Sequence, residues 1–201
     1  NAIGGDIHIL VAGHDCVTVA EQASNVAGVS QVLLADASAY EHALAENVSL
    51  LIAQIGSEYG HILATATSNA KNIMPRAAAL LDSQAISDIS AVVDGDTFKR
   101  PIYAGNVIAT VKSSDVIKVI TVRGTAFDAA SSEGGSASID TLVEAHDAEK
   151  SSFTSEEVAK SDRPELTAAD IVISGGRGMG NGENFGLLNG IADKLGAAIG
   201  A

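Results

Sequence analysis

The sequence predicts an α/β fold with two parts: an N-terminal three-layer α/β domain with a mostly parallel sheet, and the first strand–helix unit of a second α/β domain. In residues 7–65, short apolar runs alternate with Ala-rich polar stretches at helical spacing. Runs that are apolar on both faces are typical of parallel strands covered by helices on two sides. Near the C-terminus, the β-branched run 171–173 leads into a Gly-rich loop and a helix-like segment, which indicates a new unit.

The first part of the chain predicts alternating strands and helices. The expected strands are the apolar runs 7–12, 32–35, 50–55 and 62–65. Between them, 15–27 and 38–46 have helical spacing, and Asp15 and Ser38 are placed to cap these helices.

The middle of the chain predicts one helix and then three strand-like runs. The helix covers 69–81, where Pro75 requires either the first turn or a kink. The strand-like runs are 91–93, 100–111 and 116–122. A Gly-Asn pair at 105–106 breaks the second run into a hairpin. After the last strand, Asp128 is placed to pair with Arg123 and to hold the loop there.

Composition places the domain boundary near residue 158. We expect an N-terminal domain over 1–158, including a linker from about 144, and the start of a second domain over 159–201. The linker is rich in charge and poor in apolar residues, and Thr154 and Glu157 are placed to cap a short helix in it. The abrupt start and the strand-like end of the chain predict a piece of a longer protein.

Composition and charge argue against several classes of function. The 201 residues have a formal net charge of −13, so broad electrostatic binding to nucleic acid or to an anionic membrane is not expected. No apolar run approaches the roughly 18–20 residues of a membrane-spanning helix, so direct membrane insertion is not expected. Cys16 is the one cysteine, which rules out an internal disulfide and fits a reducing compartment.

The Gly-rich loop 174–182 carries the most specific functional signal. It contains Gly176, Arg177 and Gly178, a cation between two glycines that follows a strand and precedes a helix-like segment. Glycine lets the backbone approach a ligand closely, a helix start offers free N–H groups, and a guanidinium can hold a phosphate in two places. The loop lacks the Gly-Lys-Ser/Thr of a P-loop and the third Gly of the dinucleotide fingerprint. The pattern leaves two interpretations, a phosphate or cofactor seat and a tight strand-to-helix turn.

No other pattern predicts a catalytic or metal site. None of the five histidines has a metal-like spacing, and the adjacent side chains of His14 and Asp15 are expected to point apart. Cys16 at a helix start is either a low-pKa thiol or, as is more common, a buried one. Lys71 and Arg76 form either an anion seat or a solvated helix face. Because no nucleophile–base constellation is present, any chemistry is expected to belong to a bound cofactor.

Several segments together resemble the electron-transfer flavoprotein alpha subunit family. The carrying motifs are Ser-Asp-Arg-Pro-Glu-Leu-Thr at 161–167, Ser-Gly-Gly-Arg-Gly at 174–178 and Gly-Glu-Asn-Phe at 182–185. Supporting segments are 75–78, 86–89, 102–106 and 122–130. The likeness runs in one order over nearly the whole chain.

The resemblance implies a fold, cofactors and partners. The N-terminal domain is expected to have an adenine-nucleotide hydrolase-like fold that no longer binds nucleotide, and 159–201 is expected to begin the FAD-binding domain. The full protein would be a heterodimer with the beta subunit, with one FAD held mainly by the alpha subunit and AMP in the beta subunit. Electrons would pass from acyl-CoA dehydrogenases and related dehydrogenases of fatty acid beta-oxidation to a membrane quinone oxidoreductase. Such a protein is a redox carrier rather than an enzyme with its own substrate, in the bacterial cytoplasm or, in eukaryotes, the mitochondrial matrix.

The resemblance also implies which residues contact the flavin. The Arg of the Ser-Gly-Gly-Arg-Gly motif corresponds to Arg177, flanked by Gly176 and Gly178, while the later flavin-binding loops of the family lie beyond Ala201. A cation at Arg177 would either clamp the pyrophosphate or lie beside the flavin ring and raise its reduction potential. The alternative function is a non-redox adenine-nucleotide-binding regulatory or structural subunit.

Overall fold

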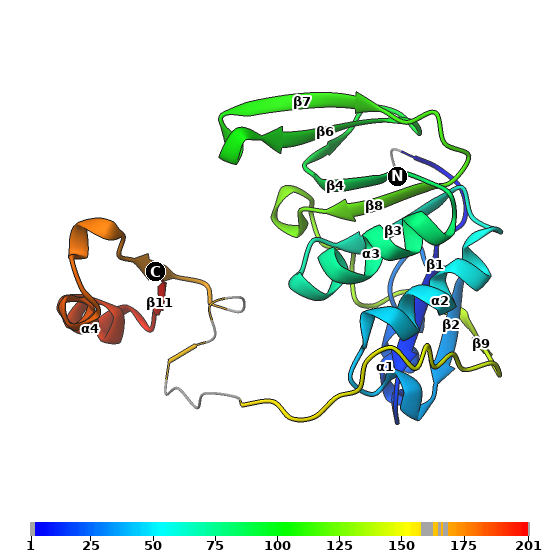
Figure 1. Ribbon diagram of the computed structural model, residues 1–201, viewed down its shortest axis with the longest axis horizontal. Helices are drawn as coiled ribbons and strands as arrows, with labels where there is room; N and C mark the ends of the chain where they lie inside the picture. Colours follow the sequence, from blue (N-terminus) through cyan, green and yellow to red (C-terminus); the bar gives the residue numbers. More distant parts are fainter. Residues whose placement is uncertain (1–2, 158–162, 165, 167–168, 201) are drawn as a thin grey trace. The chain divides into compact units, whose positions relative to one another are not determined.

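The computed structural model describes residues 3–157, 163–164, 166 and 169–200. The chain divides into two compact units, Asn1–Phe153 and Thr154–Ala201 (Figure 1). The short helix predicted in the linker is absent over 154–157, and the rest of that prediction, at 158–162, lies outside the described residues.

A parallel sheet in two sections forms the middle layer of the first unit. One section has the order β1-β2-β9 and consists of β1 (His8–Gly13), β2 (Gln31–Asp36) and β9 (Ser138–Thr141). The other has the order β3-β8-β4 and consists of β3 (His61–Thr65), β8 (Lys118–Val122) and β4 (Ala85–Ile89). Every strand pairing in both sections is parallel. The predicted mostly parallel sheet is therefore confirmed.

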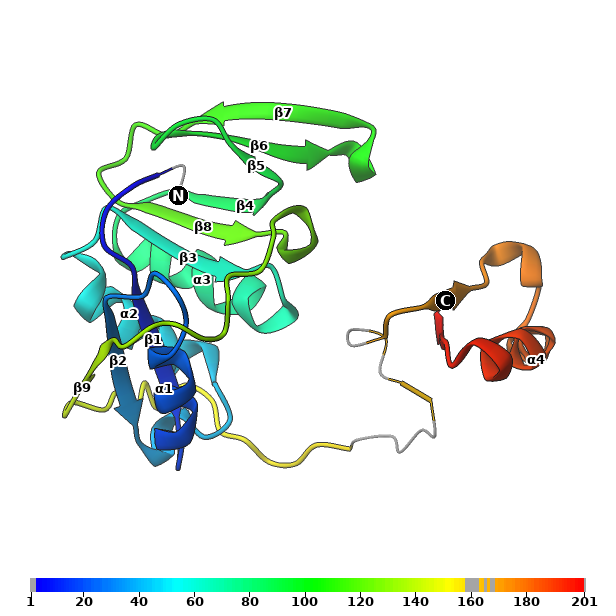
Figure 2. The ribbon, with the colours of Figure 1, turned by 180° about the vertical axis from the view of Figure 1, so that it is seen from behind.

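Helices cover both faces of this sheet. The buried cluster under α1 (Val17–Ser24) includes Ala20 of the helix and Val32 of β2. α2 (Ala45–Gly56) and α3 (Ser68–Leu80) form a second buried cluster, and Figures 1 and 2 show this helix pair and α1 on opposite sides of the sheet. The predicted three-layer arrangement is confirmed.

The predicted strand at 50–55 is wrong, because these residues belong to α2. The predicted helix at 38–46 is wrong in its bounds, since the segment forms the 3-10 turn η1 (Ser38–Tyr40) and reaches α2 only at its end. α2 is buried on more than one side, with both Ser49 and Leu51 fully buried. Burial on several sides gives a continuous apolar run that a short sequence window cannot distinguish from a buried strand.

α1 begins at a different cap from the predicted one. Asp15 has a positive φ of 52° and precedes the cap residue, Cys16. The carboxylate of Asp36, at the end of β2, accepts hydrogen bonds from the N–H groups of Asp15 and Cys16 at 2.8 and 3.0 Å. Asp36 therefore binds the two N–H groups just before α1 from a neighbouring strand, and the side chain of the cap residue, Cys16, makes no capping hydrogen bond.

A small antiparallel sheet packs on the second section of the parallel sheet. It has the order β5-β6-β7 and consists of β5 (Ala91–Val92), β6 (Thr97–Ile102) and β7 (Val107–Lys112). β6 and β7 form the predicted hairpin, joined by the turn η2 (Tyr103–Gly105). The sheet shares a buried cluster with β4 and β8 that contains Ile89, Phe98 and Ile120.

Two strands of the first unit were not predicted, while the helix at 69–81 is confirmed as α3. Thr67 caps this helix by accepting a hydrogen bond from the Ala70 N–H at 3.2 Å, and Pro75 lies inside the helix rather than in its first turn. β4 was not recognised, and β9 is exposed along its length, so its sequence shows no apolar run.

Residues 146–153, inside the predicted linker, lie against the first unit. The N–H of His146 donates a hydrogen bond to the Tyr40 hydroxyl at 2.9 Å. The rings of His42 and Phe153 stack with their centroids 3.6 Å apart. The chain therefore stays attached to η1 and α2 as far as Phe153.

Candidate functional site

The Gly-rich loop of the second unit follows directly on a parallel strand pair. β10 (Val172–Ser174) pairs with β11 (Ala198–Gly200), and both strands were predicted from the sequence. The Gly175 N–H donates a hydrogen bond to the Gly200 carbonyl at 3.1 Å. This bond fixes the start of the loop at the carboxyl end of β10, where α/β folds place their ligands.

The loop continues as two short 3-10 turns and not as a helix start. η4 (Arg177–Met179) ends at Gly180, whose φ of 81° favours glycine. η5 (Gly182–Phe185) follows, and α4 (Gly186–Leu195) begins only after it. The expected helix after the loop is therefore present as α4, and two 3-10 turns separate its start from Arg177.

Gly175 is required by packing within the unit. A Cβ at this position would meet Met179 Cγ at 2.8 Å and Phe185 Cε1 at 2.9 Å. Both distances are too short for carbon atoms in contact. The tight-turn interpretation of the loop therefore explains this glycine.

Gly176 and Gly178 are not explained by packing. A Cβ at either position would have no heavy atom of a non-neighbouring residue within 4 Å. The N–H groups of Gly176, Arg177 and Gly178 donate no hydrogen bond to any described residue. Consecutive N–H groups that have no partner among the described residues are suited to hold an anion.

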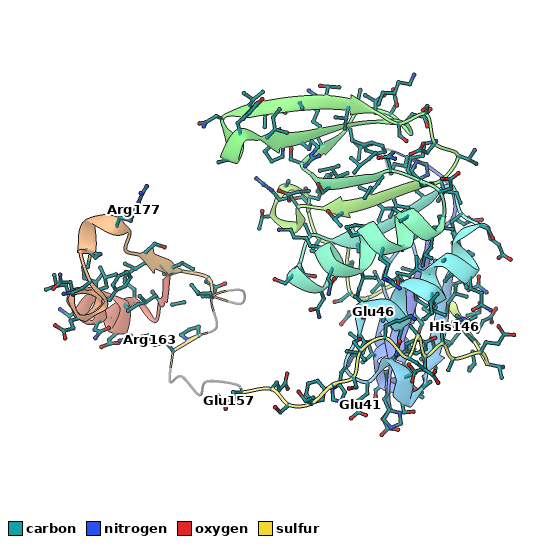
Figure 3. The ribbon with its side chains drawn as sticks, in the orientation of Figure 1. Glu41, Glu46, His146, Glu157, Arg163 and Arg177 are labelled. Carbon is teal, nitrogen blue, oxygen red and sulfur yellow. The ribbon has the colours of Figure 1, made fainter. Side chains whose placement is uncertain are left out.

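Arg177 adds a free cation to this open part of the loop. Figure 3 shows its side chain projecting from the loop, away from α4 of the same unit. Within the described part of the chain, its guanidinium makes no hydrogen bond or ion pair. The result is a positively charged edge, rich in donors, that fits a phosphate, a pyrophosphate or an oxygen-bearing edge of a ring.

Arg163 was not predicted as a site residue, yet it holds this unit together. Its Nη1 donates a hydrogen bond to Asn189 Oδ1 at 3.1 Å, and its Nε donates to Asp193 Oδ1 at 3.1 Å. Both partners lie on α4, so Arg163 fixes the chain that enters β10 against the helix. The Ser-Asp-Arg-Pro-Glu motif marks this residue in the sequence, but it does not identify partners 26 and 30 residues away.

Cys16, the one thiol, is a buried structural residue of the first unit. Burial raises the pKa of its thiol, and the negative charge of Asp36 raises it further. The low-pKa interpretation is therefore wrong, and the more common alternative, a buried thiol, describes this residue.

His14 and Asp15 do not point apart as predicted. Nε2 of His14 lies 3.9 Å from Asp15 Oδ2, and its Nδ1 lies 3.8 Å from Asp36 Oδ1. Consecutive side chains alternate only in an extended backbone, and Asp15 has a positive φ. The Asp36 carboxylate already accepts two backbone N–H groups, so local structure explains the cluster.

Comparisons with known proteins match each of the two units to a protein family model. The family model of the electron transfer flavoprotein domain matches residues 1–147, and that of the electron transfer flavoprotein FAD-binding domain matches residues 165–201. One match falls in each compact unit of the chain, and residues 148–164 lie between the two matches.

Three relatives are similar over nearly the whole chain. The electron transfer flavoprotein subunit alpha of Pseudomonas aeruginosa is 64% identical over 200 residues, which cover 100% of this chain and 65% of that protein. The protein of the same name from Paracoccus denitrificans is 52% identical over 197 residues, which cover 98% of this chain and 64% of that protein. The mitochondrial electron transfer flavoprotein subunit alpha of Dictyostelium discoideum is 48% identical over 211 residues, which cover 98% and 59%. The chain thus spans between 59% and 65% of the length of these relatives.

Proposed function

Since the chain belongs to the family of electron transfer flavoprotein alpha subunits, we propose that the full-length protein is the alpha subunit of a heterodimeric electron carrier. It accepts electrons from acyl-CoA and related dehydrogenases and passes them to a membrane quinone oxidoreductase. The match of 165–201 to the FAD-binding domain carries the proposal, and it also confirms FAD as the expected cofactor.

The Gly-rich loop fits part of this cofactor. The open backbone at Gly176 and Gly178, the free N–H groups and the guanidinium of Arg177 supply what an anionic nucleotide needs. We assign these three residues as FAD contacts. Gly175 supports them, because its close packing against Met179 fixes the start of the loop.

The bound FAD supplies one-electron chemistry that no side chain of the loop provides. Arg177 contributes a fixed positive charge to that site. If Arg177 contacts the pyrophosphate, its charge increases the affinity for FAD. If it lies beside the flavin ring, its charge raises the reduction potential of the flavin. Neither role needs a general base, which agrees with the lack of a nucleophile–base pair in the sequence.

The partner in this proposal is the electron transfer flavoprotein beta subunit, which holds AMP. One observation in the first unit supports an AMP site elsewhere. The Asp36 carboxylate accepts hydrogen bonds from the N–H groups of Asp15 and Cys16, and its negative charge just before α1 disfavours a phosphate at this helix start.

The place of action in this proposal is the bacterial cytoplasm or, for a eukaryotic protein, the mitochondrial matrix. The name of the Dictyostelium relative carries the word mitochondrial. No helix in the described part of the chain has both the length and the apolar character needed to cross a membrane.

The visible absorption spectrum of the full-length heterodimer tests the proposal. The purified complex should be yellow, and an acyl-CoA dehydrogenase with its acyl-CoA substrate should bleach the flavin bands. A colourless heterodimer that never takes up FAD would overturn the assignment, and tight adenine-nucleotide binding by such a complex would support the non-redox alternative. A yellow complex that is not bleached would overturn the assignment of the electron donor.

A further inference from the structure

The first unit contains a cavity of about 290 Å³ between α3 and the strands β4 and β8. This helix–sheet cavity is lined by Lys71, Met74 and Pro75 of α3, by Ala85, Ile86, Ser87 and Asp88 of β4 and by Val119 and Thr121 of β8. Figure 1 shows α3 running alongside this section of the sheet. Ligand pockets combine apolar walls with a few convergent polar groups, so the side chains that line this cavity decide what it can bind.

Positive charge gathers around this cavity. Asp88 forms an ion pair with Arg123, and the charges of Lys71 and Arg100 also lower the pKa of the Asp88 carboxyl. Three cations therefore surround one carboxylate. The first 70 residues contain no Lys or Arg, and the whole chain has a formal net charge of −13, so this concentration is unusual for the protein.

Two hydroxyl groups at the cavity have unused protons. Ser87 Oγ accepts a hydrogen bond from Arg100 Nη2 at 2.8 Å, and Thr121 Oγ1 accepts one from the Asp88 N–H at 2.8 Å. Each oxygen is thus already an acceptor, and its own O–H donates to no described residue. Each hydroxyl therefore has its O–H proton available to donate to a ligand.

Lys71 provides a third donor at the same place. Its ammonium makes no hydrogen bond or ion pair with the residues that the structure describes. The residue lines the cavity from the first turn of α3, and the buried side chain of Met74 lies one turn further along the same helix. The cavity therefore combines a charged end with an apolar wall.

The carboxylate of Asp88 lines the cavity, but its oxygens already accept hydrogen bonds from Arg123. Arg123 donates to both Asp88 oxygens through its Nε and Nη2 atoms. Asp88 also has a positive φ of 59°, at an irregularity in the pairing of β4 with β8. The strand is therefore bent at the residue that holds Arg123, and the charge of Asp88 is largely neutralised by its partner.

We propose that the helix–sheet cavity binds a small organic anion. Lys71 and the hydroxyls of Ser87 and Thr121 hold its carboxylate or phosphate head group, and a short apolar body packs against Met74 and Pro75. The volume lies at the lower end of the range for ligand pockets, so the ligand has few heavy atoms.

Calorimetric titration of the FAD-loaded, full-length heterodimer tests this proposal. Inorganic phosphate and propionate are the two probes, and the bound FAD ensures that neither probe enters an empty flavin site. At least one probe should bind saturably, and its identity assigns the head group. Lys71→Met should weaken binding about tenfold or more, as expected for the loss of one charge-assisted hydrogen bond.

Lys112→Met is the matched control, because Lys112 is an exposed lysine on β7 outside the cavity. It should leave the affinity for the bound probe unchanged. Ser87→Ala provides a second variant and should also weaken binding. The proposal is overturned if neither probe binds saturably, or if Lys71→Met binds the probe as tightly as Lys112→Met does.

Discussion

Nε of Arg123 donates a hydrogen bond to Oδ1 of Asp88 at 3.2 Å, which joins the carboxyl ends of β8 and β4. The sequence predicted Asp128 as the partner of Arg123, and this prediction is wrong. Parallel pairing of β4 with β8 places Ile89 opposite Val122, and the residues next to these two then meet. The register of the two parallel strands therefore determines the partner of Arg123. This partner is 35 residues away in the sequence, whereas Asp128 is only a few residues away.

The Asp88–Arg123 pair should make stability depend on acidic pH. Arg123 lowers the pKa of the Asp88 carboxyl below its ordinary value, so between the two pKa values the unfolded chain binds more protons than the folded one. The pair therefore contributes stability above the ordinary Asp pKa of about 4, and this contribution is lost as pH falls through the lowered value.

Asp88→Asn tests this dependence through urea midpoints at neutral pH and below about pH 4. The variant should be less stable than the unsubstituted protein at neutral pH and should lose less stability on acidification. Asp128→Asn removes the same charge from the partner that the sequence predicted, and it should change neither quantity. Equal effects of the two substitutions would contradict the observed pairing.

Phe98→Ala should destabilise the first unit by about 3–5 kcal/mol, because it opens a cavity in a close-packed cluster. Phe98 is fully buried between the antiparallel sheet and the β4–β8 section. Tyr103→Ala, at a side chain that is 77% exposed in the hairpin turn, should change stability by no more than about 0.5 kcal/mol. Urea unfolding monitored by far-UV circular dichroism measures both, and similar midpoints for the two variants would show that the antiparallel sheet does not share this core.

Gly135→Ala should cost about 1–3 kcal/mol, because the new Cβ overlaps the backbone. It would lie 2.3 Å from the Val26 carbonyl oxygen, next to the hydrogen bond from the Gly135 N–H to the Asn25 carbonyl at 2.8 Å. Gly60→Ala is the control, since a Cβ there meets nothing within 4 Å, and it should stay within about 1 kcal/mol of the unsubstituted protein. Thermal unfolding of both variants distinguishes a steric effect from a general effect of removing glycine.

Cys16 should react slowly with iodoacetamide in the folded protein at mildly alkaline pH. Burial and the charge of Asp36 raise the pKa of the thiol, which reduces both access and the thiolate fraction. Mass spectrometry of alkylated samples measures the rate, and unfolding in urea should bring it to that of a free cysteine peptide. A folded-state rate equal to that of the peptide would contradict the burial of this thiol.

The sequence predicted those parts of the fold whose signals are local. β1, β2 and β3 appear as short apolar runs, and the Gly-Asn pair at 105–106 marks the hairpin of β6 and β7. The run at 50–55 was assigned to a strand because a helix buried on several sides loses its amphipathic period. β9 was not predicted, because its residues are exposed and do not form an apolar run.

The candidate site was predictable in composition but not in geometry. The sequence identified Gly176, Arg177 and Gly178, and neither their N–H groups nor the guanidinium bonds to any residue that the structure describes. It did not predict that two 3-10 turns separate Arg177 from α4, because the φ of 81° at Gly180 depends on how the loop closes. The contacts of Arg163 with α4 could not be predicted from the sequence either, because they join residues that are distant in sequence.

The dissociation constant of FAD for the full-length heterodimer, measured with Arg177→Gln, tests the central claim most directly. Lys194→Gln removes an equal charge from the last turn of α4 and is the matched control. If Arg177 holds the cofactor, Arg177→Gln should weaken FAD binding about tenfold or more, while Lys194→Gln should leave it unchanged. Unaltered affinity in Arg177→Gln, or the same loss in both variants, would contradict the assignment.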